Sequence, residues 1–354
     1  MDFGINLAPA ADSWKVVERA EKLGFSHAWF YDTQLLNADV FVAMAAAAVK
    51  TERIRLGTGV LIPSNRIAPV TASALASLNK LAPGRIDFGV ATGFTARRTM
   101  GLGAVKLDDV REYVRIVRAL LERETTEWEL EGKRRKIRFL NPDLDLINTT
   151  DPIPFHFSAL GPKGKKLAAE TGMNWIIPIR DNDVAIAQLR AMQDEWRSAG
   201  RDVAGLYSTA HAGGCILGDG EAADSPRAKA QAGPAAAMVL HDMVEAEYFG
   251  TLGYRIPEAL RPILDEYKTL YEGYEPEDAR YLSVHRGHLM IVRPEEEHLI
   301  GGDLIKALSF TATAPELRER IRALGDAGFN QISFHIRYGQ DQTVEEWADL
   351  VAGV

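Results

Sequence analysis

Cysteine is nearly absent from the sequence, with Cys215 the only one among 354 residues. A single cysteine excludes a disulfide within the chain and any metal site that needs several thiolates. Cys215 stands in the apolar run GGCILG, which predicts a buried and unreactive thiol.

Positive charge is not in excess either. Lysine and arginine number 41 against 49 aspartate and glutamate residues, and the formal net charge is -8. This balance disfavours binding along a phosphate backbone, so we expect no nucleic-acid partner. One basic run, EGKRRKIR (residues 131–138), has the alternation of a solvated hairpin, with an anionic partner as the alternative.

Long hydrophobic runs are missing. No window reaches the roughly 18 uninterrupted apolar residues of a membrane span. The first residues, MDFGINLAP, contain neither the basic segment nor the apolar segment of a signal peptide. We therefore expect a cytoplasmic protein that makes no contact with a membrane.

Familiar catalytic motifs are absent as well. The sequence has no HExxH, GxSxG or Walker A motif, and ALGPKGKKLA fails as a P-loop because Ala159 stands where the first glycine is needed. His285 and His288 are three residues apart in HRGH, which is weak support for a metal site. We predict no bound metal.

A regular alternation of short apolar runs and helices of ten or more residues fills most of the chain. Near-continuous apolar strands between such helices are typical of a parallel sheet that is buried on both faces. We count eight strand–helix units, which predict an α/β fold of the (β/α)8 or TIM-barrel type, as a single domain over residues 1–354. A doubly wound sheet is the alternative, because strand order cannot be read from sequence.

A long insertion, residues 219–309, separates the seventh predicted strand from the eighth. Residues 226–253 and 257–273 have helical patterns, and YLSVHRGHLMIV (residues 281–292) resembles an extended lid segment. Segments inserted after the C-terminal end of a barrel strand lie on the active-site face. We therefore predict that this insertion caps the substrate.

The stretch SALGPKGKKLA (residues 158–168) follows a predicted strand, turns at Gly161 and Pro162, and opens a helix. Free backbone N–H groups at a helix N-terminus bind anions. Lys163, Lys165 and Lys166 add positive charge in the first turn, so we favour a phosphate site over a plain turn with solvated lysines.

Small uncharged polar groups mark the ends of the other predicted strands. They suit a planar ring system with many acceptors better than a metal or an acyl intermediate. A flavin-type cofactor also carries its own reactivity, which accounts for the missing nucleophile. The residues are Asn6, Thr58, Gly59, Thr92 and Ser158.

Three stretches together resemble the bacterial luciferase-like superfamily, which comprises FMN-dependent monooxygenases and F420-dependent oxidoreductases on a TIM barrel. They are IRLGTGVLIPSNRIAPVTASALASLNKLAPGRIDFGVATG, HAWFYD and SALGPKGKKLAAETG. The Gly-Pro-Lys turn and the GTGV corner are similar to the methylenetetrahydromethanopterin reductase branch. The resemblance covers residues 2–218 and 314–354 and leaves the insertion uncovered.

The resemblance implies roles for particular residues. A non-proline cis peptide is expected at Gly59–Val60. Asp32 matches an acidic position of the family, although Thr33 stands where the family commonly has histidine. The cofactor phosphate would be held by Ser158, Ala159, Gly161, Pro162, Lys163 and Gly164, and the ring would lie against Thr58, Gly59 and Val60.

The leading hypothesis is an FMNH2- and O2-dependent monooxygenase of a small organic substrate. A separate flavin reductase is the expected partner, as the source of FMNH2. F420-dependent hydride transfer is the alternative, and a non-catalytic flavin-binding protein is a third possibility. A homodimer is expected by analogy with the family. We predict catalytic roles for Asp32, His211 and His288, and substrate contacts for Arg180 and His285.

Overall fold

The computed structural model describes residues 1–250 and 257–354. Eight parallel strands close into a barrel, in which each strand pairs with both of its neighbours. This arrangement confirms the predicted (β/α)8 barrel and excludes the doubly wound sheet. The strands, in their order around the barrel, are β1 (Asp2–Leu7), β12 (Gln331–Ile336), β9 (Ser208–Ala212), β8 (Asn174–Ile179), β7 (Phe155–Ser158), β4 (Ile86–Val90), β3 (Arg55–Leu61) and β2 (His27–Phe30).

An outer ring of helices covers the barrel, and each helix contacts the next until α14 meets α1. Apolar side chains of these helices and of the outer strand faces form one large buried cluster. The ring consists of α1 (Trp14–Lys22), α2 (Val40–Ala48), α3 (Ala68–Leu81), α5 (Leu107–Leu121), α6 (Pro162–Thr171), α7 (Asn182–Ser198), α13 (Ala314–Ala327) and α14 (Thr343–Val351).

Polar side chains fill much of the barrel interior. Trp29 Nε1 donates to Gln331 Oε1 at 2.9 Å, and Asp87 accepts from Arg55 at 2.8 Å. His156 Nε2 lies 3.2 Å from the other oxygen of Asp87. The barrel interior is therefore packed with hydrogen-bonded side chains, which link neighbouring strands beneath the mouth of the barrel.

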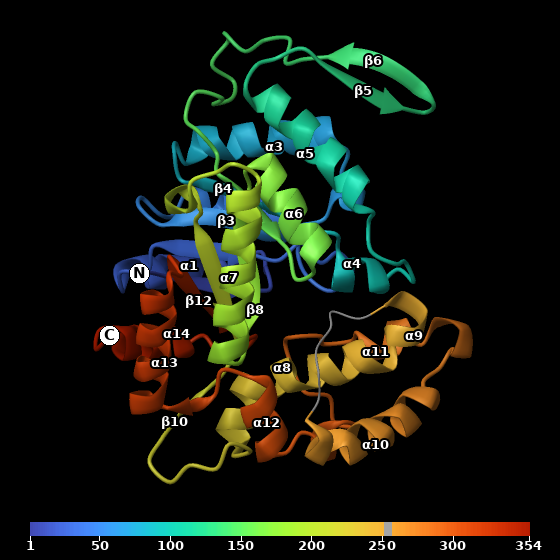
Figure 1. Cartoon of the computed structure of the whole chain (residues 1–354), viewed down its shortest axis with the longest axis vertical. Coiled ribbons are helices and arrows are strands. Elements are labelled where there is room, and N and C mark those ends of the chain that lie inside the picture. The colour runs from blue at the N-terminus through green and yellow to red at the C-terminus, as the bar shows by residue number, and fades with distance from the viewer. Residues whose placement is uncertain (251–256) are drawn as a thin grey trace.

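The basic run forms the predicted hairpin, with β5 (Thr126–Leu130) antiparallel to β6 (Lys133–Ile137). It projects from one end of the molecule, whereas the inserted segment covers the other end (Figure 1). The carboxyl ends of the barrel strands face the inserted segment.

The inserted segment between β9 and β12 is mostly helical and has a hydrophobic cluster of its own, which includes Leu240, Tyr267 and Ile300. Residues 251–256, which belong to the predicted insertion, lie outside the described residues. Its helices are α8 (Pro226–Val244), α9 (Ala246–Phe249), α10 (Arg261–Glu272), α11 (Tyr281–Val284) and α12 (Gly302–Leu308).

The structure differs from the sequence pattern at the end of β9 and in the segment 281–292. The segment LYSTAHAGGCIL (residues 206–217) has the sequence pattern of one continuous strand, but β9 ends at Ala212, and β10 (Ile216–Leu217) instead pairs with β11 (Ala312–Thr313). Gly214 allows this break, because a Cβ there would lie 2.0 Å from the carbonyl oxygen of Phe310. The segment 281–292 is not extended, since it forms α11 followed by turns.

Short helical pieces complete the chain. They are α4 (Phe94–Arg98) and the 3-10 turns η1 (Pro63–Asn65), η2 (Val203–Gly205), η3 (Glu258–Leu260), η4 (Glu277–Ala279) and η5 (Glu297–Leu299). Within the described residues, no helix is both long enough and apolar enough to cross a membrane.

Candidate active site at the mouth of the barrel

A hydrogen-bonded row of side chains crosses the mouth from β1 to the end of β12. Asn6 Nδ2 donates to the Tyr31 hydroxyl at 2.7 Å, and that hydroxyl lies 3.3 Å from His335 Nδ1. His335 Nε2 in turn lies 3.2 Å from Arg337 Nη1. Because a guanidinium only donates, His335 Nε2 must accept, which leaves Nδ1 to carry the proton toward Tyr31.

The Tyr31 oxygen therefore accepts two hydrogen bonds, and its own proton remains available to a ligand. Burial raises the pKa of Tyr31 to about 12, so the phenol stays protonated. Burial and the Arg337 charge hold the pKa of His335 well below its usual range, and the ring is neutral.

Arg337 is a buried cation, only 3 % exposed, directly after the last barrel strand. It donates to the carbonyl oxygens of Leu289 (2.7 Å) and Gln231 (3.3 Å) in the inserted segment. No carboxylate forms an ion pair with it within the described residues. Burial lowers the pKa of Arg337 to about 10, so it keeps its charge at neutral pH.

A buried unpaired guanidinium favours an anionic ligand. Sequence analysis missed Arg337 and Tyr31. The available signal was a charged or phenolic residue immediately after an apolar strand, in QISFHIR and HAWFY.

His211 lies in the predicted place on β9, within the mouth. Its Nε2 atom is buried without a hydrogen-bond partner among the described residues. Burial, with a smaller effect of His156, lowers the pKa of His211 to about 3. The ring is thus a neutral imidazole that can accept or donate one hydrogen bond, and not a base at neutral pH.

The corner at the end of β3 contains the cis peptide expected at Gly59–Val60. A Cβ on Gly59 would lie 2.8 Å from Trp29 Cβ and 3.4 Å from His211 Cε1, so glycine allows close packing here. Thr58 is fully buried, and its hydroxyl bonds to the N–H and carbonyl of Gly89 at 3.0 and 2.7 Å. Thr58 thus locks two strands together and presents no side-chain group to a cofactor.

Asp32, a predicted catalytic residue, organises the loop after β3 instead. Its Oδ2 accepts from the Ile62 N–H and from Asn65 Nδ2, both at 3.1 Å, and its Oδ1 accepts from Arg66 at 3.0 Å. The side chain is 4 % exposed. These three hydrogen bonds make Asp32 a positioning group for the loop, and its predicted catalytic role stays a prediction.

The predicted phosphate cradle is a helix N-terminus, as expected. Gly161 precedes α6 in an extended conformation, and no side chain caps the helix. A Cβ on Gly161 would meet nothing within 4 Å, so the first N–H groups are open to a ligand. Among the predicted residues, Gly161, Pro162 and Lys163 are exposed, Ser158 is partly buried, and Ala159 and Gly164 are buried.

The three lysines of this turn differ. Lys165 is buried and donates to Gln188, and Lys166 lies 3.9 Å from Glu170. Lys163 has no ion-pair partner within residues 1–250 and 257–354. It is the lysine that fits a phosphate at this N-terminus.

The other predicted contacts lie around the same mouth or in the inserted segment. Arg180 Nε donates to the Leu308 carbonyl at 2.8 Å, which ties β8 to α12. Thr92 is partly buried at the end of β4, and its carbonyl accepts from the Val105 N–H at 2.8 Å. Asn6 is only 2 % exposed and acts through Tyr31.

His285 and His288 are buried inside the inserted segment and do not form a surface turn. His288 reaches the barrel, since its Nε2 lies 3.2 Å from Thr95 Oγ1 in α4. Both rings pack against a third histidine, His241 of α8, which sequence analysis did not single out.

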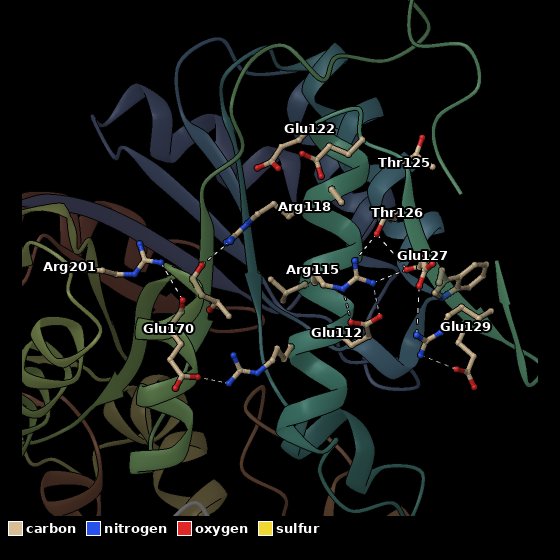
Figure 2. A pocket seen from close by; sticks show the side chains of 17 residues that line it. Glu112, Arg115, Arg118, Glu122, Thr125, Thr126, Glu127, Glu129, Glu170 and Arg201 are labelled. Atoms are coloured by element: carbon tan, nitrogen blue, oxygen red, sulfur yellow. Dashed lines mark hydrogen bonds and ion pairs between the residues drawn. The ribbon is translucent and has the colours of Figure 1, made fainter. Parts of the chain in front are cut away.

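A groove of about 810 Å3 lies at the opposite end of the barrel, between α5, the hairpin and the C-terminus of α6. Figure 2 shows that ion pairs line it, including Arg115 with Glu112 at 2.7 Å and Arg111 with Glu170 at 2.5 Å. Because this groove lies away from the carboxyl ends of the barrel strands, we place the candidate active site at the mouth.

Comparison with known proteins agrees with this geometry. The sequence model of the luciferase-like monooxygenase family matches residues 6–331. A 5,10-methylenetetrahydromethanopterin reductase of Methanolobus tindarius is 30% identical over 239 residues, which are 64% of this chain and 69% of that protein. An F420-dependent glucose-6-phosphate dehydrogenase of Beutenbergia cavernae is 35% identical over 141 residues, covering 38% of this chain and 40% of that protein.

Solved structures share the fold. The coenzyme F420-dependent tetrahydromethanopterin reductase of Methanopyrus kandleri superposes with a TM-score of 0.71 over 99% of this chain and 98% of that chain, at 20% identity. At this identity the likeness establishes the barrel architecture alone.

Proposed function

Because the chain belongs to the luciferase-like monooxygenase family, we propose that it is an oxidoreductase that uses the deazaflavin F420 to transfer hydride to or from a small organic substrate. The observation that carries this proposal is the mouth itself. Among the described residues, Arg337 is a buried cation without a carboxylate partner. The same mouth contains a phenol whose proton is available and, at His211, a neutral imidazole whose Nε2 has no hydrogen-bond partner within those residues. F420 is favoured over FMN because one of the relatives named above is called F420-dependent.

The residues of the mouth fit such a cofactor. Lys163 and the open N–H groups of α6 would hold the phosphate, and the corner at Gly59 and Val60 would support the ring. The Nε2 atom of His211, which has no partner in the part of the chain that the structure describes, offers a hydrogen bond to a ring heteroatom. When bound, the cofactor supplies the hydride chemistry that no side chain of this mouth provides.

The chain would supply charge, orientation and a proton. Arg337 neutralises negative charge on a ligand in a site where burial strengthens the interaction. Tyr31 donates its proton to a substrate oxygen, and the neutral His335 holds the phenol in place. Asp32 keeps the neighbouring loop ordered through Asn65 and Arg66.

An FMN-dependent monooxygenase is the second candidate. The description of the matching family, luciferase-like monooxygenase, favours it. In that case a separate flavin reductase would supply the reduced cofactor. The homodimer remains a prediction, which sedimentation equilibrium tests.

Titration of the cofactor-free protein with F420 and with FMN, followed by fluorescence, tests the proposal. We expect F420 to bind with the higher affinity. Lys163→Ala should weaken binding about tenfold, whereas Lys166→Ala, on the same helix but paired with Glu170, should not change it. FMN binding with oxygen-dependent turnover would establish the second candidate, and binding of neither cofactor would overturn both.

Tyr31→Phe tests the proton donor. It removes the hydroxyl that general acid catalysis needs, so kcat should fall about a hundredfold or more. KM for F420 should stay within about threefold, because the ring of residue 31 remains. An unchanged kcat in Tyr31→Phe would exclude Tyr31 as the proton donor.

A further inference from the structure

Three histidines of the inserted segment converge at the place where it meets the barrel. His241 lies near the C-terminus of α8, His285 follows α11, and His288 lies in the next turn. Their exposed fractions are 2 %, 3 % and 7 %. One nitrogen from each ring can be chosen so that all three lie within 4.8 Å of one another. We propose that this cluster binds a zinc-type divalent metal ion through the three Nδ1 atoms and so fixes the inserted segment over the mouth.

The nitrogen separations match those of a metal site. His288 Nδ1 lies 3.2 Å from His241 Nδ1 and 3.4 Å from His285 Nδ1. Zinc binds histidine nitrogen at about 2.0–2.1 Å in tetrahedral geometry, which places two ligand nitrogens roughly 3.3–3.4 Å apart. Two of the three separations therefore match a tetrahedral zinc site, and the three ligand atoms together lie within 4.8 Å of one another.

Each histidine also has a partner on its outer nitrogen. His241 Nε2 lies 3.0 Å from Glu296 Oε2, and His285 Nε2 lies 2.9 Å from Glu245 Oε2. An ionised carboxylate can only accept a hydrogen bond, so both Nε2 atoms are N–H donors, and both Nδ1 atoms of the neutral rings present lone pairs to the centre. Carboxylate–histidine pairs of this kind orient metal ligands in proteins.

Hydrogen bonding within the cluster cannot satisfy these lone pairs. His288 is bonded at Nε2 to Thr95 Oγ1 at 3.2 Å, and its Nδ1 can carry at most one proton. That proton can point at one of the two facing nitrogens, and the other lone pair then faces the centre without a donor. A cation interacts favourably with all three nitrogens at once.

Buried ion pairs surround the three histidines. Arg98 lies 3.1 Å from Asp242 and 3.6 Å from Glu245, and Arg293 lies 2.6 Å from Glu296. These three buried carboxylates face two buried guanidinium groups. The buried Arg337, which donates to the carbonyl of Leu289 next to His288, adds a third, so the buried charges around the histidines balance. Glu296, which holds the outer nitrogen of His241, is itself fixed in place, because the Tyr267 hydroxyl also donates to it at 3.0 Å.

The ligand set selects the metal class. Three neutral imidazoles without a thiolate suit Zn2+, with Co2+, Ni2+ or Cu2+ as substitutes. Three protein ligands leave a fourth position for water or a small ligand. Thr95 belongs to α4, which follows β4, so the ion would join α8, the turn after α11 and the rim of the barrel.

Metal titration of the full chain tests the site without any activity measurement. After treatment with a chelator, the protein should bind one equivalent of Zn2+ in calorimetry, and Co2+ should produce the visible absorption bands of a tetrahedral nitrogen site. Absence of a one-equivalent binding event in the unmodified chain would overturn the proposal, whatever the variants do.

Variants then locate the site. His288→Ala and His241→Ala should each abolish stoichiometric binding and the Co2+ bands. His298→Ala is the matched control, because His298 is exposed and pairs only with Glu266 among the described residues, so it should bind as the wild type does. Glu245→Gln should weaken affinity about 10- to 100-fold. Retention of the bands in His288→Ala, with native circular dichroism, would place the metal elsewhere.

Discussion

Burial decides which reactive side chains of this protein are available to reagents. Cys215 is fully buried, and burial raises the pKa of its thiol to about 12. Since the thiolate is the nucleophile, we expect no reaction with a disulfide reagent such as DTNB at pH 8 in the native state. One equivalent should react after unfolding in guanidinium chloride. Rapid labelling of the native protein would show that the thiol is accessible after all.

Asp87 is the residue whose charge most directly holds the barrel interior together. It is 2 % exposed and pairs with Arg55 at 2.8 Å and with His156 at 3.2 Å. Burial alone would raise its pKa, but the hydrogen bonds and charges of these two partners outweigh burial and lower it. Asp87→Asn should therefore reduce the free energy of unfolding by about 3 kcal/mol at pH 7.

The sign of the pH dependence follows from the lowered pKa. The stabilisation is present above the unfolded pKa of about 3.9 and is lost as the pH falls through the folded value. In urea unfolding, the difference in the free energy of unfolding between the wild type and Asp87→Asn should thus become smaller below about pH 4. Asp145→Asn, an exposed residue paired with Lys80, should change stability by less than about 0.5 kcal/mol.

At the scale of elements, the caps fix where the chain turns back into the barrel. Thr313 begins α13 with a capping box, in which its hydroxyl and its N–H both meet Glu316, at 2.7 and 2.9 Å. Thr313→Ala should cost about 1 kcal/mol in urea unfolding. Thr269→Ala, within the exposed face of α10, serves as the control. An equal loss in both variants would contradict a specific capping role.

Elements with local signals were predictable, and those set by distant contacts were not. The strands were predicted correctly from short apolar runs between amphipathic helices, because a helical period and a short apolar run can each be recognised within about ten residues. The break after β9 was missed, since Gly213 and Gly214 look continuous with the strand until the carbonyl of Phe310 is seen against them.

At the scale of the whole molecule, the candidate site was only partly predictable for the same reason. The cradle at Gly161 and the corner at Gly59 are contiguous in sequence and were identified. The hydrogen bonds of Asp32 to Asn65 and Arg66 could not be predicted, because these partners come more than thirty residues later. His241 was overlooked because the fold alone brings it to His288.

Acid sensitivity is a property of the whole molecule, since buried neutral histidines are spread around the barrel. Burial is the main cause that lowers the pKa of His27 to about 4 and of His211 to about 3. For His27, the nearby charges of Asp87 and Asp2 oppose this shift, and those of Arg55 and His156 add to it.

In the unfolded chain both histidines titrate near pH 6.5, so below that pH the unfolded state binds protons that the folded state does not. The free energy of unfolding must then fall as the pH drops from about 6.5 toward the folded values, by roughly 2 kcal/mol for each histidine at pH 5. Carboxylates contribute little in this window, because their unfolded pKa values lie near 4. Urea unfolding at pH 7, 6 and 5 in the presence of a chelator should show this loss. In His27→Gln, the free energy of unfolding should fall less steeply with decreasing pH than in the wild type. His298 is exposed, so His298→Gln should keep the pH dependence of the wild type. A flat profile between pH 7 and 5 would mean that these histidines are charged in the folded protein, and would contradict their assignment as neutral rings.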